Sequence, residues 1–175
     1  MSTNLPTDIE RLNLLPASEA EDELLKCCGS KEWAQLALAQ RPFENITDLL
    51  AKSDRIWWAL DQGDWLEAFH SHPRIGEKKA GAKIAPRSQQ WSEDEQSGIS
   101  NSARETIEAL AELNRVYEEK FGYIFIVCAS GKSSEEMLAI LRERLANDPE
   151  EELRVAAAEQ AKITRLRLRK LIDNQ

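Results

Sequence analysis

The chain has 175 residues, of which 42% are hydrophobic, and this is enough apolar material for one continuous core. The sequence therefore predicts a single compact domain over residues 1–175. A formal net charge of −8 argues against a nucleic-acid partner, because nucleic-acid binders need a basic surface. No segment approaches the ~20 apolar residues of a membrane-spanning helix, and the first residues lack a signal-peptide pattern, so we expect no membrane partner and a cytoplasmic location.

The composition favours an all-α fold. Only seven glycines and six prolines occur, whereas residues with high helix propensity, such as Ala, Leu, Glu and Lys, are abundant. Hydrophobic periodicity predicts about eight to nine helices and one long loop. The expected helices span residues 8–14, 18–28, 31–39, 45–60, 63–70, 92–99, 103–121, 134–145 and 149–172.

Several helix starts carry capping signals. A serine followed three residues later by a glutamate matches the capping box at Ser18, Ser92, Ser102 and Ser133, and Asp148 precedes Pro149. These signals predict N-termini close to those positions.

Two long helices carry polar residues on their apolar stripes. The helix over 103–121 aligns Ile107, Leu110, Asn114, Tyr117 and Phe121. The last helix aligns Leu153, Ala156, Gln160, Ile163, Arg167 and Leu171, whereas Arg165 and Arg169 point the opposite way. Arg167 is thus predicted to face inward. It could do so for a function, or its methylene chain could pack on the stripe while its guanidinium reaches solvent or pairs with a structural carboxylate.

Two segments lack helical periodicity. Residues 72–91 form a long stretch with several glycines and prolines, and long loops inside compact domains are usually functional or disordered. The run FGYIFIVCASGKS is short, apolar and bounded by glycines, and predicts a buried extended segment. Core packing alone would also explain that run.

The two histidines of the chain are His70 and His72, next to the turn that Pro73 begins. Histidine exchanges protons near neutral pH, so His72 is a candidate general acid or base. A capping or core histidine is the alternative, and it is the favoured interpretation for His70.

Several blocks in order resemble the 2-oxo-4-hydroxy-4-carboxy-5-ureidoimidazoline (OHCU) decarboxylases. They are KCCGSKEWAQLALAQRPF, FENITDLL, FHSHPRIGE, WSEDEQSG, LNRVYEEKFGYIFIVCASGKS and KITRLRLRKL. The resemblance runs nearly from end to end. It implies an all-helical, usually dimeric enzyme of urate catabolism that removes CO₂ from OHCU to give (S)-allantoin without metal or organic cofactor.

The resemblance also implies site residues. It assigns catalysis to His72 and Glu95, with Glu95 orienting the histidine, although a capping box opened by Ser92 would equally explain Glu95. Arg167 matches the family's substrate-binding arginine. Further substrate contacts are implied for Pro73, Ser92, Gln96, Phe121, Ile124, Phe125 and Ile126. Many relatives have proline where this chain has Ile124, so the contacts of Ile124 to Ile126 depart most from the family pattern.

Two other classes of function stay open from the residues alone. A metal-dependent hydrolase would use His70 and His72 with acidic ligands, because two imidazoles two residues apart can share a metal. A non-enzymatic helical adaptor would dock its acidic surface on a basic partner. Neither accounts for the ordered blocks, and the adaptor leaves the long loop unexplained.

Overall fold

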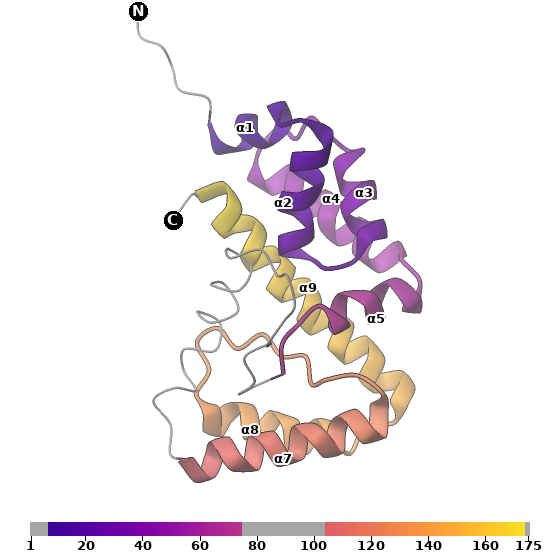
Figure 1. Cartoon of the computed structure of the whole chain (residues 1–175), viewed down its shortest axis with the longest axis vertical. Helices are drawn as coiled ribbons and strands as arrows, with labels where there is room; N and C mark the ends of the chain where they lie inside the picture. The colour runs from indigo at the N-terminus through magenta and orange to yellow at the C-terminus, as the bar shows by residue number, and fades with distance from the viewer. Residues whose placement is uncertain (1–6, 75–103, 174–175) are drawn as a thin grey trace, which may run out of the picture. The chain divides into compact units, whose positions relative to one another are not determined.

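The computed structural model describes residues 7–74 and 104–173 of the chain. These residues form eight helices and no strand, which confirms the predicted all-α fold. Figure 1 shows their course along the chain. They are α1 (Asp8–Leu14), α2 (Ala17–Cys27), α3 (Lys31–Leu38), α4 (Ile46–Ala59), α5 (Gln62–His70), α7 (Arg104–Phe121), α8 (Ser134–Arg144) and α9 (Pro149–Asp173).

The predicted helices agree with these bounds to within one residue at each end, and the helix predicted over 92–99 lies outside the described residues. The Ser133 capping box is present with both of its hydrogen bonds, and the Asp148 carboxylate accepts from the first amides of α9. The capping box predicted at Ser18 is wrong. Pro16 is the N-cap of α2 without a side-chain cap, so Ser18 already lies inside the first turn. The boxes predicted at Ser92 and Ser102 lie outside the described residues.

The chain divides into two compact units, which are described separately. Unit 1 comprises residues 1–67 and 161–175, and unit 2 comprises residues 68–160. The division falls within α5 and within α9. The single domain over residues 1–175 stays a prediction.

In unit 1, α3 packs against both α2 and α4 (Figure 1). The apolar faces of these helices bury Leu24, Trp33, Leu49 and Trp57 almost completely. The indole nitrogen of Trp33 donates to the carbonyl of Ser53, 3.4 Å away, so even the polar atom of this large side chain has a partner in the core.

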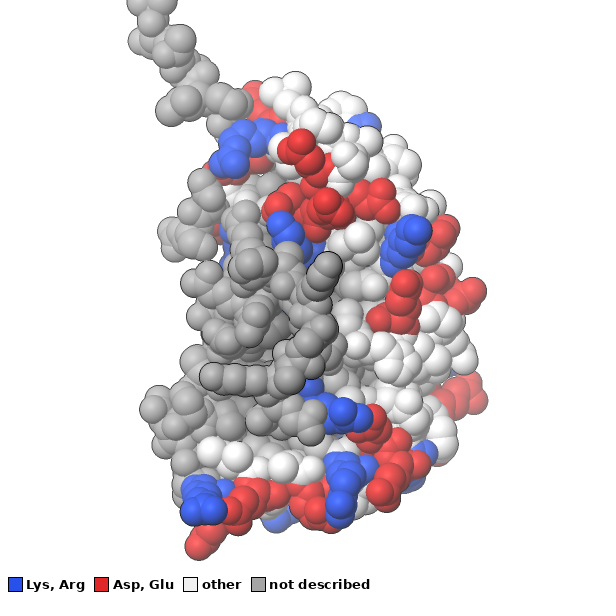
Figure 2. Space-filling model, viewed as in Figure 1, with Lys and Arg blue, Asp and Glu red and all other residues white. Residues whose placement is uncertain are grey.

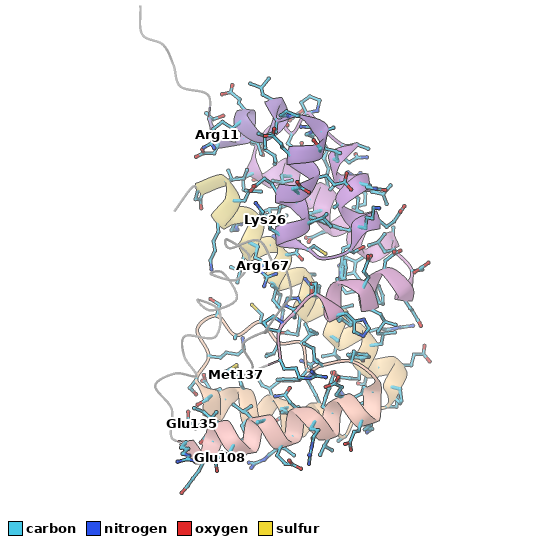
Figure 3. All side chains as sticks on the ribbon, in the orientation of Figure 1. Arg11, Lys26, Glu108, Glu135, Met137 and Arg167 are labelled. Carbon is cyan, nitrogen blue, oxygen red and sulfur yellow. The ribbon has the colours of Figure 1, made fainter. Side chains whose placement is uncertain are left out.

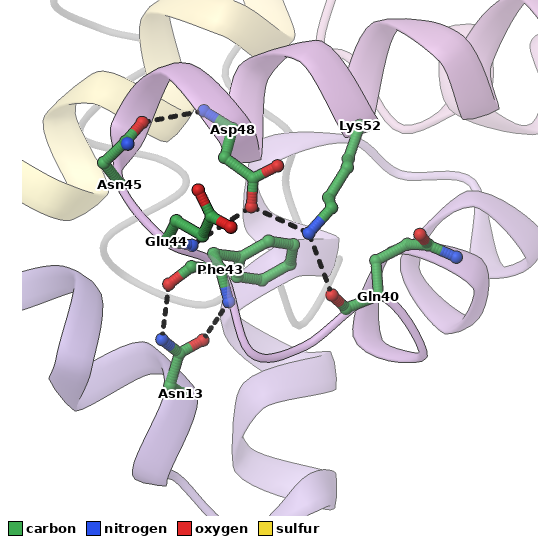
Figure 4. A network of polar contacts seen from close by, with 7 residues as sticks. All are labelled: Asn13, Gln40, Phe43, Glu44, Asn45, Asp48 and Lys52. Carbon is green, nitrogen blue, oxygen red and sulfur yellow. Dashed lines mark hydrogen bonds and ion pairs between the residues drawn. The ribbon is translucent and has the colours of Figure 1, made fainter.

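The connection between α3 and α4 is fastened by side-chain hydrogen bonds (Figure 4). Asn13 donates to the Phe43 carbonyl and accepts from the Phe43 amide, both at 2.8 Å. The Lys52 Nζ atom lies 2.7 Å from Asp48 Oδ2, and this contact holds the pKa of the half-buried Asp48 carboxyl below its usual range. The peptide bond between Arg41 and Pro42 in this connection is cis.

In unit 2, α7 packs against α8 (Figure 1). The predicted stripe of α7 is confirmed, because Leu110, Asn114 and Tyr117 are buried while Ile107 and Phe121 are half-buried. The α8 helix contributes the buried Met137 and Leu141 to the core of this unit.

The surface is mixed in charge where the structure describes it. On the face in Figure 2, acidic side chains are interspersed with basic ones. Among the described residues, no helix is both long and apolar enough to span a membrane.

Candidate active site

His72 lies in a hydrogen-bonded turn that follows the end of α5. The Ser71 and His72 amides donate to the carbonyls of Ala68 and Phe69, both at 3.2 Å. Two residues beyond His72, the Arg74 guanidinium makes two hydrogen bonds of 2.9 and 2.6 Å to the carboxylate of Glu118 on α7. The same contact lowers the pKa of Glu118. The backbone on both sides of His72 is therefore held, with the half-buried Pro73 between them.

The imidazole of His72 is half-buried and has a polar partner on α9. Its Nε2 atom lies 2.6 Å from the side-chain oxygen of Gln160, a residue with no exposed surface. His70 is exposed at the end of α5. The two histidines thus occupy different environments. The exposed His70 is not a core histidine, and the catalytic role of His72 stays a prediction.

The segment after α7 is neither helix nor strand, as predicted. Gly122 ends the helix with φ of 82°, a left-handed conformation that favours glycine. Tyr123, Phe125 and Ile126 are buried, and Ile124 is half-buried. The Phe69 ring, three residues before His72, lies 5.2 Å from the Tyr123 ring, so the histidine turn and this segment belong to one packed cluster.

A buried ion pair supports the segment. Arg144 and Glu152 have side chains only 7% and 0% exposed, and Arg144 Nε donates to Glu152 Oε1 at 2.7 Å. A second nitrogen of the guanidinium, Nη1, donates to the Ile126 carbonyl at 2.6 Å, and the Arg144 Cζ atom lies 4.6 Å from the centroid of the Phe125 ring. Arg144 therefore fixes the backbone at a position implied in substrate binding.

Both oxygens of the Glu152 carboxylate accept hydrogen bonds in this cluster. It accepts from the Tyr117 hydroxyl in a short hydrogen bond and from the Asn147 side chain at 2.9 Å. Burial raises the pKa of Tyr117 well above its ordinary value, so the phenol remains a donor. The sequence places Tyr117 on an inward stripe, whereas no signal in it distinguishes Arg144 and Glu152 from ordinary charged residues at a helix end and a helix start.

Arg167 lies in unit 1, on the last turns of α9 (Figure 3). It is 4% exposed, whereas Arg165 and Arg169 are exposed, so the predicted inward orientation is confirmed. Arg165 instead pairs with Asp54 on the surface of the unit. Burial raises the pKa of the neighbouring Cys28 thiol to about 11, and the positive charge of Arg167 acts in the opposite direction.

The structure brings some predicted site residues together and leaves others untested. His72, Pro73, Phe121 and residues 124–126 belong to unit 2, and Arg167 belongs to unit 1. Ser92, Glu95 and Gln96 lie outside the described residues, so their roles stay predictions. Within residues 7–74 and 104–173, no group of three or more His, Cys, Asp or Glu side chains could hold a metal ion.

Gln160 is a neighbour of His72 that was not predicted as a site residue. The signal was present, because Gln160 stands on the inward stripe of the last helix and is the polar residue there besides Arg167. A single helical stripe does not reveal which loop its polar member meets. The contact with His72 could therefore not be predicted.

Comparison with known proteins assigns the fold and then the family. The helices match a crystal structure of OHCU decarboxylase in the presence of (S)-allantoin with a TM-score of 0.74 and 38% identity, over 87% of this chain and 98% of that one. A family model for OHCU decarboxylase matches residues 13–169. The chain therefore belongs to the OHCU decarboxylase family, which confirms the resemblance and the fold that it implied.

Two relatives agree with this assignment. The chain is 38% identical over 156 residues to the uric acid degradation bifunctional protein TTL of Arabidopsis thaliana, which covers 89% of this chain. It is 33% identical over 135 residues to the 2-oxo-4-hydroxy-4-carboxy-5-ureidoimidazoline decarboxylase of Amia calva, with 76% of this chain and 75% of that protein covered. The match spans about half, 48%, of the Arabidopsis protein.

Proposed function

We propose that this chain decarboxylates OHCU to (S)-allantoin in urate breakdown, with no metal or organic cofactor. The observation that carries the proposal is the family match over residues 13–169, which includes His72 and Arg167. The similar structure with (S)-allantoin supports the identity of the product. The metal-dependent hydrolase and the adaptor have no comparable support.

The substrate's own structure explains why no cofactor would be needed. Its ring carbon carries a carboxylate and a hydroxyl beside a conjugated C=N bond. When the bond to the carboxylate breaks, CO₂ leaves and the electron pair passes to that C=N bond. The protein's tasks are to hold the carboxylate out of the ring plane and to deliver a proton to one face of the ring, which sets the handedness of the product.

The proposed roles follow the chemistry of each residue. His72 is the acid or base at the reacting carbon, and Glu95 orients it. The guanidinium of Arg167 binds the anionic substrate through charge-assisted hydrogen bonds. Pro73, Ser92 and Gln96 contribute further substrate contacts, with Gln96 binding ureido or ring amides.

The backbone from Phe121 to Ile126 is proposed to hold the heterocycle. The Ile126 carbonyl already accepts a hydrogen bond from Arg144, so the substrate contact of Ile126 is proposed for its amide. Ile124 has an N–H that a proline at this position would lack, which adds one donor to the segment. The half-buried Phe121 is proposed to supply apolar surface for the planar ring, whereas the Phe125 ring is buried against Tyr117.

Assembly and location belong to the same proposal. The family resemblance supports a homodimer, and the sequence features support the cytoplasm. Size-exclusion chromatography with light scattering measures the first. We expect twice the monomer mass, and the mass of one monomer would reject the dimer.

The test generates OHCU from urate with the two preceding enzymes and follows allantoin handedness by circular dichroism. We expect rapid formation of one enantiomer by the wild type and a loss of about 10²- to 10⁴-fold in rate for His72→Ala, typical of a removed general acid or base. His70→Ala is the matched control, because His70 is exposed, and it should retain most activity. An inactive wild type would reject the proposed function, and a fully active His72→Ala variant would reject the role of His72.

A further inference from the structure

The contact between His72 and Gln160 bears on which nitrogen of the imidazole carries the proton. The Nε2 atom faces the Oε1 atom of Gln160 at 2.6 Å, well within hydrogen-bond distance. A carboxamide oxygen is an acceptor only, so a hydrogen bond to it requires a proton on Nε2. We infer that Gln160 is a positioning residue that holds His72 in the tautomer protonated at Nε2.

Both residues of this contact are held in position by their surroundings. Gln160 has no exposed surface and stands on the buried stripe of α9, between Ala156 and Ile163. The backbone of His72 is tied to Phe69, and the residue two positions later is tied to α7 through the pair of Arg74 with Glu118. Because both ends of the hydrogen bond are held, the bond fixes the ring about its side-chain torsions as well as its tautomer.

The tautomer has a chemical consequence for a histidine that moves protons. With the proton of the neutral ring on Nε2, the lone pair lies on Nδ1, so Nδ1 is the atom that takes up and returns the transferred proton. Gln160 stays neutral throughout, whereas the carboxylate proposed for Glu95 accepts only from a protonated nitrogen, so its orienting contact would form with Nδ1 once the ring is an imidazolium. The catalytic part of this inference rests on the proposed role of His72, whereas the tautomer does not.

The first experiment reads the tautomer without substrate. The full chain is labelled with ¹⁵N at its two histidines, and correlations from ring carbon protons to ring nitrogens are recorded above the pH at which the rings are protonated. A His70→Asn variant assigns the His72 signals. We expect an Nε2 signal of the protonated type and an Nδ1 signal of the lone-pair type for His72. The opposite pattern would mean that the carboxamide donates its NH₂ group to Nε2, and it would overturn the inference.

Two variants then separate positioning from packing. Gln160→Met has a similar length and no strong acceptor, and we expect mixed tautomers for His72, with unchanged signals for His70. Gln160→Glu restores an acceptor oxygen, and we expect the Nε2 proton to return. A single Nε2 tautomer that persists in Gln160→Met would overturn the inference, because another contact would then set it.

Kinetics gives the functional readout of the same variants. We expect Gln160→Met to lower kcat by about 10- to 100-fold with a smaller change in KM, because a misplaced proton-transfer group affects the chemical step. A kcat within about twofold of wild type would remove Gln160 from the positioning role. If His72→Ala itself kept full activity, the proposed function of His72 would fail while the tautomer measurement would still stand.

Discussion

Replacing Arg144 by methionine should be among the most destabilising single changes in unit 2. The variant leaves the Glu152 carboxylate, whose side chain is 0% exposed, without its cation, and it removes the hydrogen bond to the Ile126 carbonyl. Breaking a buried ion pair by removing one partner costs about 3–5 kcal/mol. For a chain of this length, that corresponds to a drop in Tm of roughly 6–20 °C.

The measurement is urea unfolding followed by far-ultraviolet circular dichroism, which reports all helices. The matched control is Arg154→Met on α9, because Arg154 pairs with Glu150 four residues earlier and both side chains are more than 70% exposed. An exposed pair of this kind contributes only about 0.3–0.5 kcal/mol. Equal losses for the two variants would refute the argument that burial makes the Arg144 pair important.

A double variant tests the cause of the loss. Glu152→Gln removes the buried charge and retains an oxygen that can accept from the Tyr117 hydroxyl. Combined with Arg144→Met, it should recover part of the lost stability, because no unpaired charge remains in the core. A double variant as unstable as the sum of the two single ones would show that lost packing, and not an unpaired charge, dominates.

Three further predictions follow from the described contacts. Burial raises the pKa of Tyr123 to about 12 and that of Tyr117 further, so the stability that the two protonated phenols contribute is full below pH 10 and is lost as pH rises toward their native pKa values. The absorbance of their tyrosinate forms should therefore appear only when the protein unfolds at alkaline pH. A rise in absorbance before unfolding would contradict this. Ser133→Ala should cost about 1 kcal/mol in urea unfolding by removing a capping box, whereas Ser18→Ala should stay within about 0.5 kcal/mol because Ser18 caps nothing. Arg167→Ala should weaken substrate binding more than Arg165→Ala, measured as KM for OHCU, since only Arg167 faces inward; equal effects would reject its assignment.

The sequence predicted what depends on local spacing. The bounds of the helices and the inward orientation of Arg167 follow from apolar periodicity and from end signals such as the Ser133 box. The failure at Ser18 has the same local origin, because the chain enters α2 already at Ala17, directly after Pro16, and makes the serine a first-turn residue. Periodicity indicates which residues face inward, but it does not indicate which element they pack against.

What could not be predicted are contacts between residues far apart in the chain. Arg144 meets Ile126 across 18 positions and Tyr117 meets Glu152 across 35, and no short motif marks either pair. Arg144, Tyr117 and Glu152 resemble common helix residues at common helical positions, and Ile126 resembles any apolar residue of a buried segment. Their significance lies in the burial that tertiary packing gives them.

The contact of His72 with Gln160 joins residues 88 positions apart. Each residue could be singled out from local features of the sequence, but their contact could not. The histidine was found because the chain has few histidines and one of them begins a loop, and the glutamine was found on an inward stripe. Each was a polar side chain whose position called for a partner, since buried polar groups are almost always hydrogen-bonded. The sequence does not indicate which residue a polar side chain on an inward stripe meets, so the pairing itself could not be predicted. A neutral amide also suits the position of Gln160. When the half-buried His72 imidazole loses its proton, the amide beside it carries no charge, so no unpaired charge is left buried in the protein.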